Sequence, residues 1–330
     1  MERVTIEVLP PGSEYHPLMS REILPLTLVV PTGNRTVALR RTLASLAEQS
    51  AQPAELSIVD ASTDGSTRLL CEEESIPKLR SAVLWSRADS PGAASQRNQG
   101  VRACSQSIVG FMDDDVLLEP DCFARLWLAL HSDDRIGGVS AMITNQRYQS
   151  PGRISRIVFR LVDARPESSY AGSVLGPAVN LLPEDRDDLP DVVPVEWLNT
   201  TCTLYRRDAL PDPPFPDQFK GYSLMEDVTL SLIVGRRWKV ANARTARIYH
   251  DSQPGSHKVD PELIAEMQLV NRHYVMTKVL GRSRISDYLK LFLFELFSLI
   301  STLQVPSGRM VLGPTLRGKA KASWFIARKR

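Results

Sequence analysis

Three consecutive carboxylates follow a short apolar run near the end of the first third of the chain. Residues 108–112 are apolar or small, and Asp113, Asp114 and Asp115 come directly after them. A short continuous apolar run suits a strand buried on both faces. Two unit charges about 4 Å apart repel by roughly 4 kcal/mol at an effective dielectric constant near 20. The carboxylates therefore form either a solvated turn before Pro120 or a site for a cation such as Mg²⁺, which prefers oxygen ligands.

A second acidic pair, Glu226 and Asp227, precedes the apolar run 228–234. Acidic residues are common at a helix start, where they complement the helix dipole. A carboxylate there could also act as a general base, if it lies within hydrogen-bond reach of an attacking hydroxyl. His250 follows a strand-like run and is either a structural residue or a ligand. The residue types alone leave both interpretations open for each of these positions.

Asp60 and Arg97 are two further polar residues with a chemical interpretation. Asp60 ends the apolar run 56–59 and either accepts the ring N–H of a uracil-like base or closes a turn with Ser62 and Asp64. Arg97 follows Pro91 and Gly92 at the start of a predicted helix, where anions bind favourably. The alternative for Arg97 is an ordinary surface arginine.

The elements that would position these residues alternate between strand and helix in the first half of the chain. The predicted strands are 26–30, 56–59, 83–85, 108–112, 136–143, 193–205 and 239–249. The predicted helices include 37–49, 121–130, 228–238, 262–280 and 288–303. This alternation is typical of a parallel sheet with crossover helices, whose ligands bind beyond the carboxyl ends of the strands. Residues 146–192 are polar and rich in Pro and Gly, and we expect a long irregular loop there.

The C-terminal region combines an apolar run with a basic tail. The run 288–303 contains Lys290 and Glu295 and is shorter than the roughly 20 residues that span a bilayer. After Ser301 the chain has seven Lys or Arg residues and no acid. An apolar face with cationic flanks suits a helix that lies on an anionic membrane. A helix packed on the body of the protein, or a contact with a second subunit, is the open alternative.

Composition excludes several classes of protein. The 330 residues are 43% apolar and 24% charged, as in an ordinary globular protein, and the net charge of +2 gives no basic field for nucleic acid. The four cysteines show no CxxC spacing, which argues against a zinc knuckle or a disulfide scaffold and favours a reduced, cytosolic compartment. The first residues lack the pattern of a signal peptide. The Gly-rich phosphate-binding motifs GxGxxG, expected after the first strand, and GxxxxGK[ST] are also missing.

Taken together, the motifs VVPTGNR, VDASTDGST, AASQRNQGVRA, VGFMDDDVLLEP and MEDVTLSLIVGRRWKV resemble the family 2 inverting glycosyltransferases. The resemblance covers residues 24–280. It implies a GT-A fold, which is an α/β architecture with a Rossmann-like, mixed and mostly parallel central sheet flanked by helices. We expect a lead-in over 1–23, a nucleotide-sugar-binding half over 24–145, an acceptor half over 146–280, and a helical, basic extension over 281–330.

The resemblance also implies roles for individual residues. Asp227 would be the catalytic base, with Glu226 positioning it or binding the acceptor. The implied donor-binding residues are Pro31, Thr32, Arg35, Asp60, Arg97, Asp113 and Asp114. The implied ligands of a divalent Mg²⁺ or Mn²⁺ ion are Asp113, Asp115 and His250. Trp197, Asn199 and Thr200 fall where acceptor-binding residues are expected.

The implied activity is inverting, metal-dependent transfer of a hexosyl or deoxyhexosyl group. The donor would be a nucleoside-diphosphate sugar, and the acceptor a saccharide or lipid-linked saccharide in polysaccharide or glycolipid synthesis. An anionic membrane surface is a further candidate partner, so we expect a cytoplasmic protein that could bind the inner face of the plasma membrane. The alternatives are a sugar nucleotidyltransferase and a non-catalytic module that binds nucleotide sugars.

Overall fold

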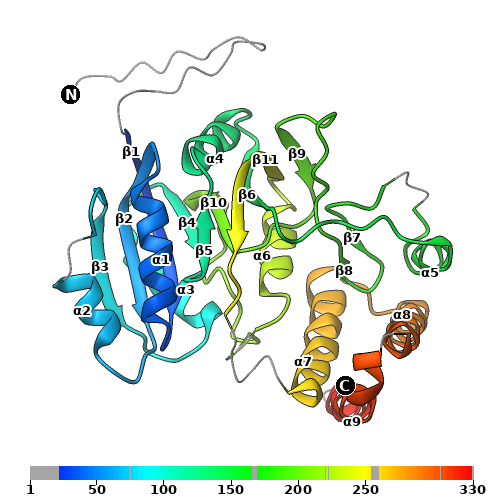
Figure 1. Cartoon of the computed structure of the whole chain (residues 1–330). Coiled ribbons are helices and arrows are strands. Elements are labelled where there is room, and N and C mark those ends of the chain that lie inside the picture. Colours follow the sequence, from blue (N-terminus) through cyan, green and yellow to red (C-terminus); the bar gives the residue numbers. More distant parts are fainter. Residues whose placement is uncertain are drawn as a thin grey trace.

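The structure is a computed structural model of the chain, and it describes residues 22–73, 76–165, 169–219, 221, 223–253, 260–304 and 306–328. The predicted lead-in over 1–23 lies almost entirely outside these residues. The described part forms a central sheet with helices on both faces and a group of helices beyond one edge (Figure 1). This arrangement confirms the predicted α/β fold class with C-terminal helices.

Eleven strands are present in the described part of the chain, nine of them in the central sheet. They are β1 (Glu22–Thr32), β2 (Ala51–Asp60), β3 (Ala82–Arg87), β4 (Ile108–Met112), β5 (Val116–Leu118), β6 (Ile136–Ile143), β7 (Val174–Leu175), β8 (Val179–Asn180), β9 (Val192–Val195), β10 (Cys202–Arg206) and β11 (Lys239–His250). The sheet order is β3-β2-β1-β4-β10-β6-β11-β5, with β9 also paired to β11.

The sheet is mixed but mostly parallel, as predicted. β1 runs parallel to β2 and to β4, β2 to β3, and β6 to β11. β10 is antiparallel to both of its neighbours, β4 and β6, so a strand from the second half of the chain lies in the middle of the sheet. β5 and β9 are antiparallel to β11.

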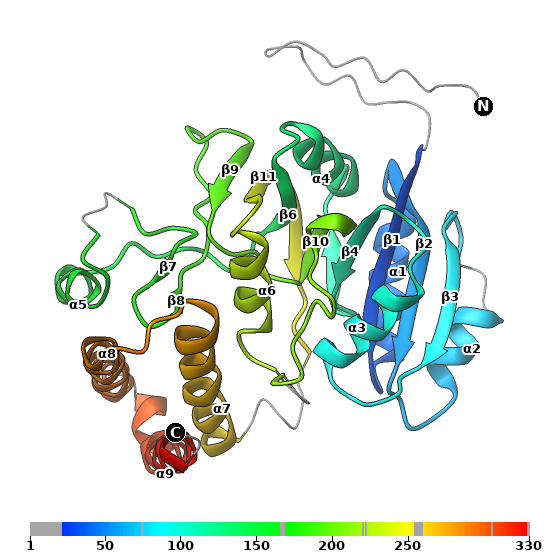
Figure 2. The same ribbon diagram turned by 180° about the vertical axis from the view of Figure 1, so that it is seen from behind.

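The helices are α1 (Thr36–Ala47), α2 (Ser66–Glu72), α3 (Ala93–Ala103), α4 (Cys122–His131), α5 (Arg153–Asp163), α6 (Glu226–Val234), α7 (Pro261–Tyr274), α8 (Ile285–Leu303) and α9 (Pro306–Arg328). A short π-helical segment, Val275–Val279, continues α7. One face of the sheet shares a core with α1 and α4, and the other face shares a core with α3 and α6. Figures 1 and 2 show α1 and α3 on opposite faces of the sheet.

The apolar sequence of β4 fits its position in the sheet, because all five of its residues are buried. Met112 packs in the core beneath α1 and α4, while Phe111 packs in the core on the other face. On that second face α3 lies very close to β1. A β-carbon on Gly100 would overlap the side chain of Val29, so the tight packing of α3 requires glycine there.

The expectation of an irregular loop over 146–192 was only partly right, because much of the described segment is irregular but it also holds regular elements. This segment contains α5 and the small β7–β8 hairpin. Helix α5 carries two apolar groups: Val158, Phe159 and Val162 are buried, whereas Ile154, Ile157 and Leu161 are exposed. The two groups adjoin on the helix surface, so the sequence does contain one broad apolar arc opposite Arg153, Arg156 and Arg160, and its helical period was overlooked.

The C-terminal residues form α8 and α9, in the region where a helical extension was expected. Both lie beyond the sheet, beside α5 and α7 (Figure 1). Within the described residues, no helix is long and apolar enough to cross a membrane. The division of the chain at residues 145 and 280 stays a prediction.

Candidate active site

A cleft of about 540 Å³ opens beside the carboxyl ends of β1 and β4 and the first turn of α6. Its walls come from distant parts of the chain, including the segments after β1, after β4 and before α6. The predicted site residues that line it are Pro31, Thr32, Arg35, Arg97, Asp113, Asp114, Asp115, Thr200, Glu226, Asp227 and His250. The two acidic groups that are far apart in sequence therefore face one cleft.

The carboxylates after β4 are not a solvated turn. Asp114 and Asp115 are each only 4% exposed, while Asp113 is partly buried. The Asp114 carboxylate accepts a hydrogen bond from the Thr32 hydroxyl at 2.7 Å and pairs with Arg35 at 3.2 Å. Burial raises the pKa of Asp114 to about 6, although the Thr32 hydrogen bond and the Arg35 charge oppose this rise.

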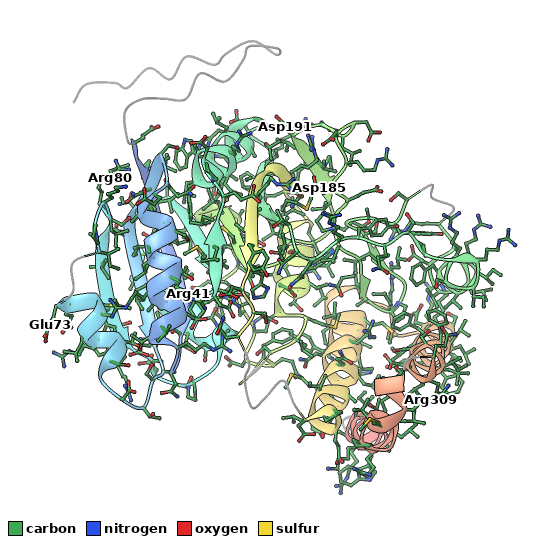
Figure 3. All side chains as sticks on the ribbon, viewed as in Figure 1. Arg41, Glu73, Arg80, Asp185, Asp191 and Arg309 are labelled. Atoms are coloured by element: carbon green, nitrogen blue, oxygen red, sulfur yellow. The ribbon has the colours of Figure 1, made fainter. Side chains whose placement is uncertain are left out.

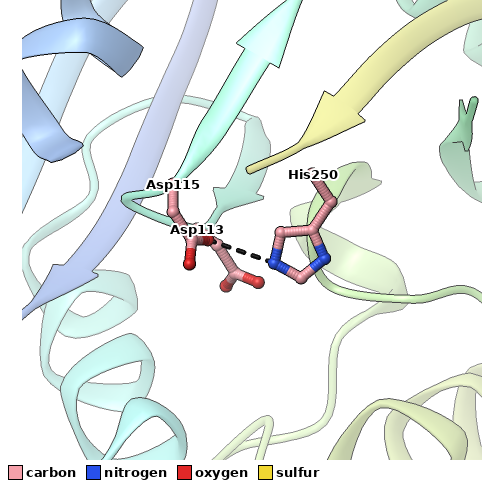
Figure 4. Close-up of side chains that lie close together, drawn as sticks. All are labelled: Asp113, Asp115 and His250. Atoms are coloured by element: carbon pink, nitrogen blue, oxygen red, sulfur yellow. Dashed lines mark hydrogen bonds and ion pairs between the residues drawn. The ribbon is translucent and has the colours of Figure 1, made fainter. Parts of the chain in front are cut away.

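Asp113, Asp115 and His250 each offer a ligand atom, and these atoms lie within 4.8 Å of one another (Figure 4). His250 Nε2 lies 3.1 Å from Asp115 Oδ1, and Gln253 N–H donates to Asp115 Oδ2 at 3.0 Å. Burial disfavours the charged form of Asp115, but these two hydrogen bonds, together with the charges of His250 and Arg35, lower the pKa of its carboxyl. Carboxylate oxygens with an imidazole nitrogen suit Mn²⁺ or Mg²⁺, so the residues fit a divalent ion.

Arg97 connects the two acidic groups. Its guanidinium donates to Asp113 Oδ1 at 2.6 Å and to Glu226 Oε1 at 3.3 Å. The Arg97 side chain is only 3% exposed, which excludes the surface arginine that the sequence left open. A buried guanidinium between two carboxylates fixes the distance between the end of β4 and the start of α6.

Glu226 and Asp227 occupy the first turn of α6, after Met225 with a φ of 72°. Burial and the neighbouring Asp227 charge raise the pKa of Glu226 to about 8, with Arg97 opposing the rise. Burial likewise raises the pKa of Asp227 to about 6, although its Oδ1 accepts the Val228 N–H at 2.7 Å. A carboxylate with a pKa near the working pH is suited to taking up a proton.

Three of the predicted site residues do not line the cleft. Asp60 is fully buried, and its carboxylate accepts hydrogen bonds from Ser62 N–H at 2.8 Å and Trp85 Nε1–H at 3.2 Å. The structure thus has the turn that was one of the two interpretations of Asp60. Trp197 is buried and donates its indole N–H to the Leu181 carbonyl at 2.7 Å. Asn199 is also buried, whereas its neighbour Thr200 reaches the cleft.

Sequence reasoning missed two features of the cleft. Gln96 donates to the Thr32 and Val59 carbonyls at 2.8 and 2.7 Å, and so holds the ends of β1 and β2 together. Gly92, with a φ of 130°, forms a bridge to Gly221, whose backbone N would lie 2.9 Å from a β-carbon at position 92. The Pro-Gly dipeptide signalled a turn there, but the sequence carried no sign of the partner segment.

Comparison with known proteins then identifies the family. The family model described as glycosyl transferase family 2 matches residues 27–210, which is more than half of the chain. The chain belongs to glycosyl transferase family 2. This protein is therefore a glycosyltransferase, as the sequence motifs predicted. Asp113, Asp114 and Asp115 lie inside the matched range, whereas Glu226, Asp227 and His250 lie beyond it.

Curated relatives match this glycosyltransferase over a limited region. Validoxylamine A glucosyltransferase from Streptomyces hygroscopicus subsp. limoneus is 33% identical over 126 residues. That region is 37% of this chain and 26% of the relative. A second validoxylamine A glucosyltransferase, from subsp. jinggangensis, is 32% identical over 126 residues, 37% of this chain and 28% of the relative. The chain thus spans about a quarter of the length of these relatives.

Solved structures share the fold over most of the chain. The mannosyltransferase PcManGT from Pyrobaculum calidifontis, in complex with GDP-Man and Mn²⁺, aligns with a TM-score of 0.55 and 16% identity. The alignment covers 96% of this chain and 91% of the mannosyltransferase. GalNAc-T7, with UDP, GalNAc and Mn²⁺, aligns with a TM-score of 0.51 and 14% identity over 78% of this chain and 48% of GalNAc-T7. These likenesses confirm the predicted GT-A fold.

Proposed function

We propose that this glycosyltransferase moves a sugar from a nucleoside-diphosphate sugar to an acceptor hydroxyl, with inversion at the anomeric carbon and with help from a divalent cation. One observation carries the proposal. The carboxylates after β4 and the acidic pair at the start of α6 face the same cleft, and Arg97 joins them through Asp113 and Glu226.

The charge of the cleft supports the need for a cation. Its described lining residues include four aspartates, Asp113, Asp114, Asp115 and Asp227, and only two guanidiniums, Arg35 and Arg97, while Glu226, whose pKa is about 8, is largely protonated at neutral pH. A diphosphate would be repelled by this surplus of carboxylates. Asp113, Asp115 and His250 would hold the ion. When bound, a divalent ion supplies Lewis-acid stabilisation for the charge that develops on the leaving diphosphate.

Asp227 acts as the general base in the proposed reaction. Its carboxylate takes the proton of the acceptor hydroxyl while that oxygen attacks the anomeric carbon from the side opposite the diphosphate. The bond from the anomeric carbon to the phosphate oxygen breaks, and its electron pair leaves with the diphosphate. This direct displacement inverts the anomeric configuration. Glu226, held by Arg97, positions the pair or binds the acceptor.

The donor binds on the side of the cleft formed by the ends of β1 and β4. Thr32 and Arg35 hold Asp114 in place there, and both line the cleft. Asp60 stays part of the proposed donor site, but the turn that it forms with Ser62 must open before its carboxylate can reach the nucleobase of the donor. Two proteins of the same fold were solved with GDP-Man or with UDP and GalNAc, each together with Mn²⁺, which supports this class of donor and of ion.

The proposed acceptor is a saccharide or a lipid-linked saccharide. Of the predicted acceptor-binding residues, Thr200 lines the cleft. The carbonyl of its neighbour Thr201 accepts a hydrogen bond from the Asp113 N–H. Trp197 and Asn199 are buried and do not line the cleft. They would shape the acceptor site by supporting that segment rather than by direct contact.

The decisive experiment is Asp227→Asn, which removes the base and leaves the side-chain volume nearly unchanged. We expect the rate of transfer to fall by about 10³-fold or more. Donor binding should be kept, so in a thermal-shift screen of GDP-, UDP- and dTDP-sugars with Mn²⁺ the same donor should stabilise the variant and the unchanged protein. Asp134→Asn is the control, because Asp134 is fully exposed and far from the cleft. Retained transfer in Asp227→Asn would remove the base assignment. Proton NMR of the first product tests inversion separately.

A further inference from the structure

Helix α8 exposes an unbroken apolar stripe along its whole length. Its large apolar side chains recur every three or four residues, at the spacing of one helix face. The stripe consists of Ile285, Leu289, Phe292, Leu296, Ile300 and Leu303, which are between 39% and 82% exposed. Only Leu291 of α8 is fully buried. A 19-residue helix is about 28 Å long, so this is a large apolar surface for a folded protein.

Helix α5, which the sequence analysis missed, adds a second exposed apolar stripe with a basic flank. Ile154, Ile157 and Leu161 are each more than half exposed and lie on one side of the exposed face. Arg153, Arg156 and Arg160 are exposed on the other side, by the period of an α-helix. The buried face of α5 packs against the body through residues such as Phe159.

The two helices lie side by side at one edge of the molecule. α8 contacts both α5 and α9, and the Phe159 cluster beneath α5 includes Phe294 of α8. All three helices appear end-on in Figures 1 and 2, so their axes run alongside one another. In Figure 3, Arg309 of α9 lies at this edge, and Glu73, the residue after α2, lies at the opposite edge.

The free charge at this edge is positive. α5 and α8 contain three acids, of which two are paired with cations and the third, Asp287, is outnumbered by the basic side chains described next. Asp163 pairs with Arg165, Glu295 pairs with Arg272 and Lys319, and Asp287 accepts the Arg284 N–H at the start of α8.

The basic side chains of these helices have no such partner. Within the described part of the chain, no carboxylate pairs with Arg153, Arg156, Arg160 or Lys290. Exposed apolar side chains next to uncompensated cations complement a surface with an apolar interior and an anionic boundary.

We propose that the exposed stripes of α5 and α8, with the three α5 arginines, form a platform that docks on an anionic lipid bilayer. The apolar side chains enter the boundary of the acyl chains, and the arginines contact the headgroups. The inference goes beyond sugar transfer, because docking needs no reaction. Docking would hold the enzyme at a membrane, which is where a lipid-linked acceptor would be found.

The test is flotation of the full chain with vesicles, which measures binding without turnover. Vesicles of 70% phosphatidylcholine and 30% phosphatidylglycerol should carry the protein, whereas vesicles of phosphatidylcholine alone, or 0.5 M NaCl, should weaken binding. We expect Leu289→Gln/Phe292→Gln to lower the partition coefficient at least about 10-fold. The control Leu69→Gln/Leu128→Gln changes residues of α2 and α4 that are about half exposed, and it should bind normally.

The electrostatic part is tested with a matched pair of double variants. Arg153→Gln/Arg160→Gln should lower partition into the anionic vesicles about 30-fold, since each cation near the surface contributes about fivefold. Arg87→Gln/Arg237→Gln removes the same charge from exposed arginines elsewhere and should have little effect. All changed side chains are exposed, so the variants should fold, and circular dichroism checks this.

Three results would overturn the platform. The first is no binding of the unchanged protein to anionic vesicles. The second is binding that the platform variants and their controls weaken equally. The third is a dimer in light scattering that becomes a monomer in Leu289→Gln/Phe292→Gln, without vesicle binding, which would make the α8 stripe a contact between two copies. Each result leaves the Asp227→Asn experiment unaffected.

Discussion

Replacement of Arg97 by methionine tests the connection between the two halves of the cleft. Arg97 is nearly buried, and it holds Asp113 at 2.6 Å and Glu226 at 3.3 Å. Methionine fills much of the same volume but removes the positive charge. Loss of one partner from a buried ion pair typically costs about 3–5 kcal/mol of folding free energy. Part of this cost is offset because, without the Arg97 charge, the carboxyl groups of Asp113 and Glu226 can be protonated and therefore uncharged.

The pH dependence gives the sharper measurement. The Arg97 charge opposes the rise in the pKa of Asp227, which burial places at about 6. A unit charge several ångströms away contributes about 1–2 kcal/mol at an effective dielectric constant near 20, or about one pKa unit. A base works only when deprotonated, so activity is lost as the pH falls through its pKa. Without Arg97, the loss of activity should begin about one pH unit higher. At pH 6, Asp227 would then be deprotonated in about a tenth of the enzyme molecules, compared with about half in the wild type.

The assay is kcat/KM against pH between 5 and 9, because this ratio reports ionisation in the free enzyme. Arg97→Lys is the first control, since it keeps the charge and should leave the acid limb near pH 6. Arg35→Met is the second, because Arg35 pairs with Asp114 and Asp115 instead. An effect of Arg97 on the pKa of Asp227 is refuted if Arg97→Met loses activity at the same acidic pH as the wild type and Arg35→Met. The Arg97 charge would then act on folding and not on the pKa of the acidic pair.

Three further predictions concern the ion, the packing and the acidic pair. His250→Ala should weaken Mn²⁺ binding at least about 10-fold in calorimetry, because it removes the nitrogen ligand proposed to lie next to Asp115. Gly100→Ala should lower the free energy of unfolding in urea by about 1–3 kcal/mol, because the methyl group overlaps Val29. The pKa of Glu226 is raised from 4.5 to about 8, so the wild type loses stability as the pH rises between these values. Glu226→Gln lacks this titration, so its stability relative to the wild type should rise by at least about 1 kcal/mol between pH 5 and pH 8 in thermal unfolding.

The position of the carboxylates after β4 could be predicted because it follows from backbone topology, whereas their convergence with Glu226 and Asp227 was implied by the family resemblance. Residues 108–112 were recognised as a buried strand, and the carboxyl ends of parallel strands lie at one edge of the sheet. Asp113 and Asp115 therefore had to lie at the ligand-binding edge. His250 was placed beside them by the family motif, and the antiparallel pairing of β11 with β5 brings it there.

The contacts of individual side chains could not be predicted in the same way. Nothing in the sequence indicates that Arg97 bridges Asp113 and Glu226, because the spacing between α3 and α6 depends on the whole core. The direction of Asp60 is decided by Ser62 and Trp85, which offer it two donors inside the protein. Helix α5 has a helical apolar period that could have been recognised in the sequence, but the sequence does not show that half of its apolar arc is exposed, which is the basis of the membrane proposal.

The central position of β10 has a consequence for the order of assembly during synthesis. β4 leaves the ribosome long before β10, yet β10 is the strand that hydrogen-bonds along its open side. Until residues 202–206 emerge, the edge of β4 that later pairs with β10 has no hydrogen-bond partner in the nascent chain. An unpaired edge on an apolar strand is a known starting point for aggregation. We expect chaperone dependence to be greatest for ribosome-bound chains that stop between β6 and β10, and to decline once β10 is available for pairing.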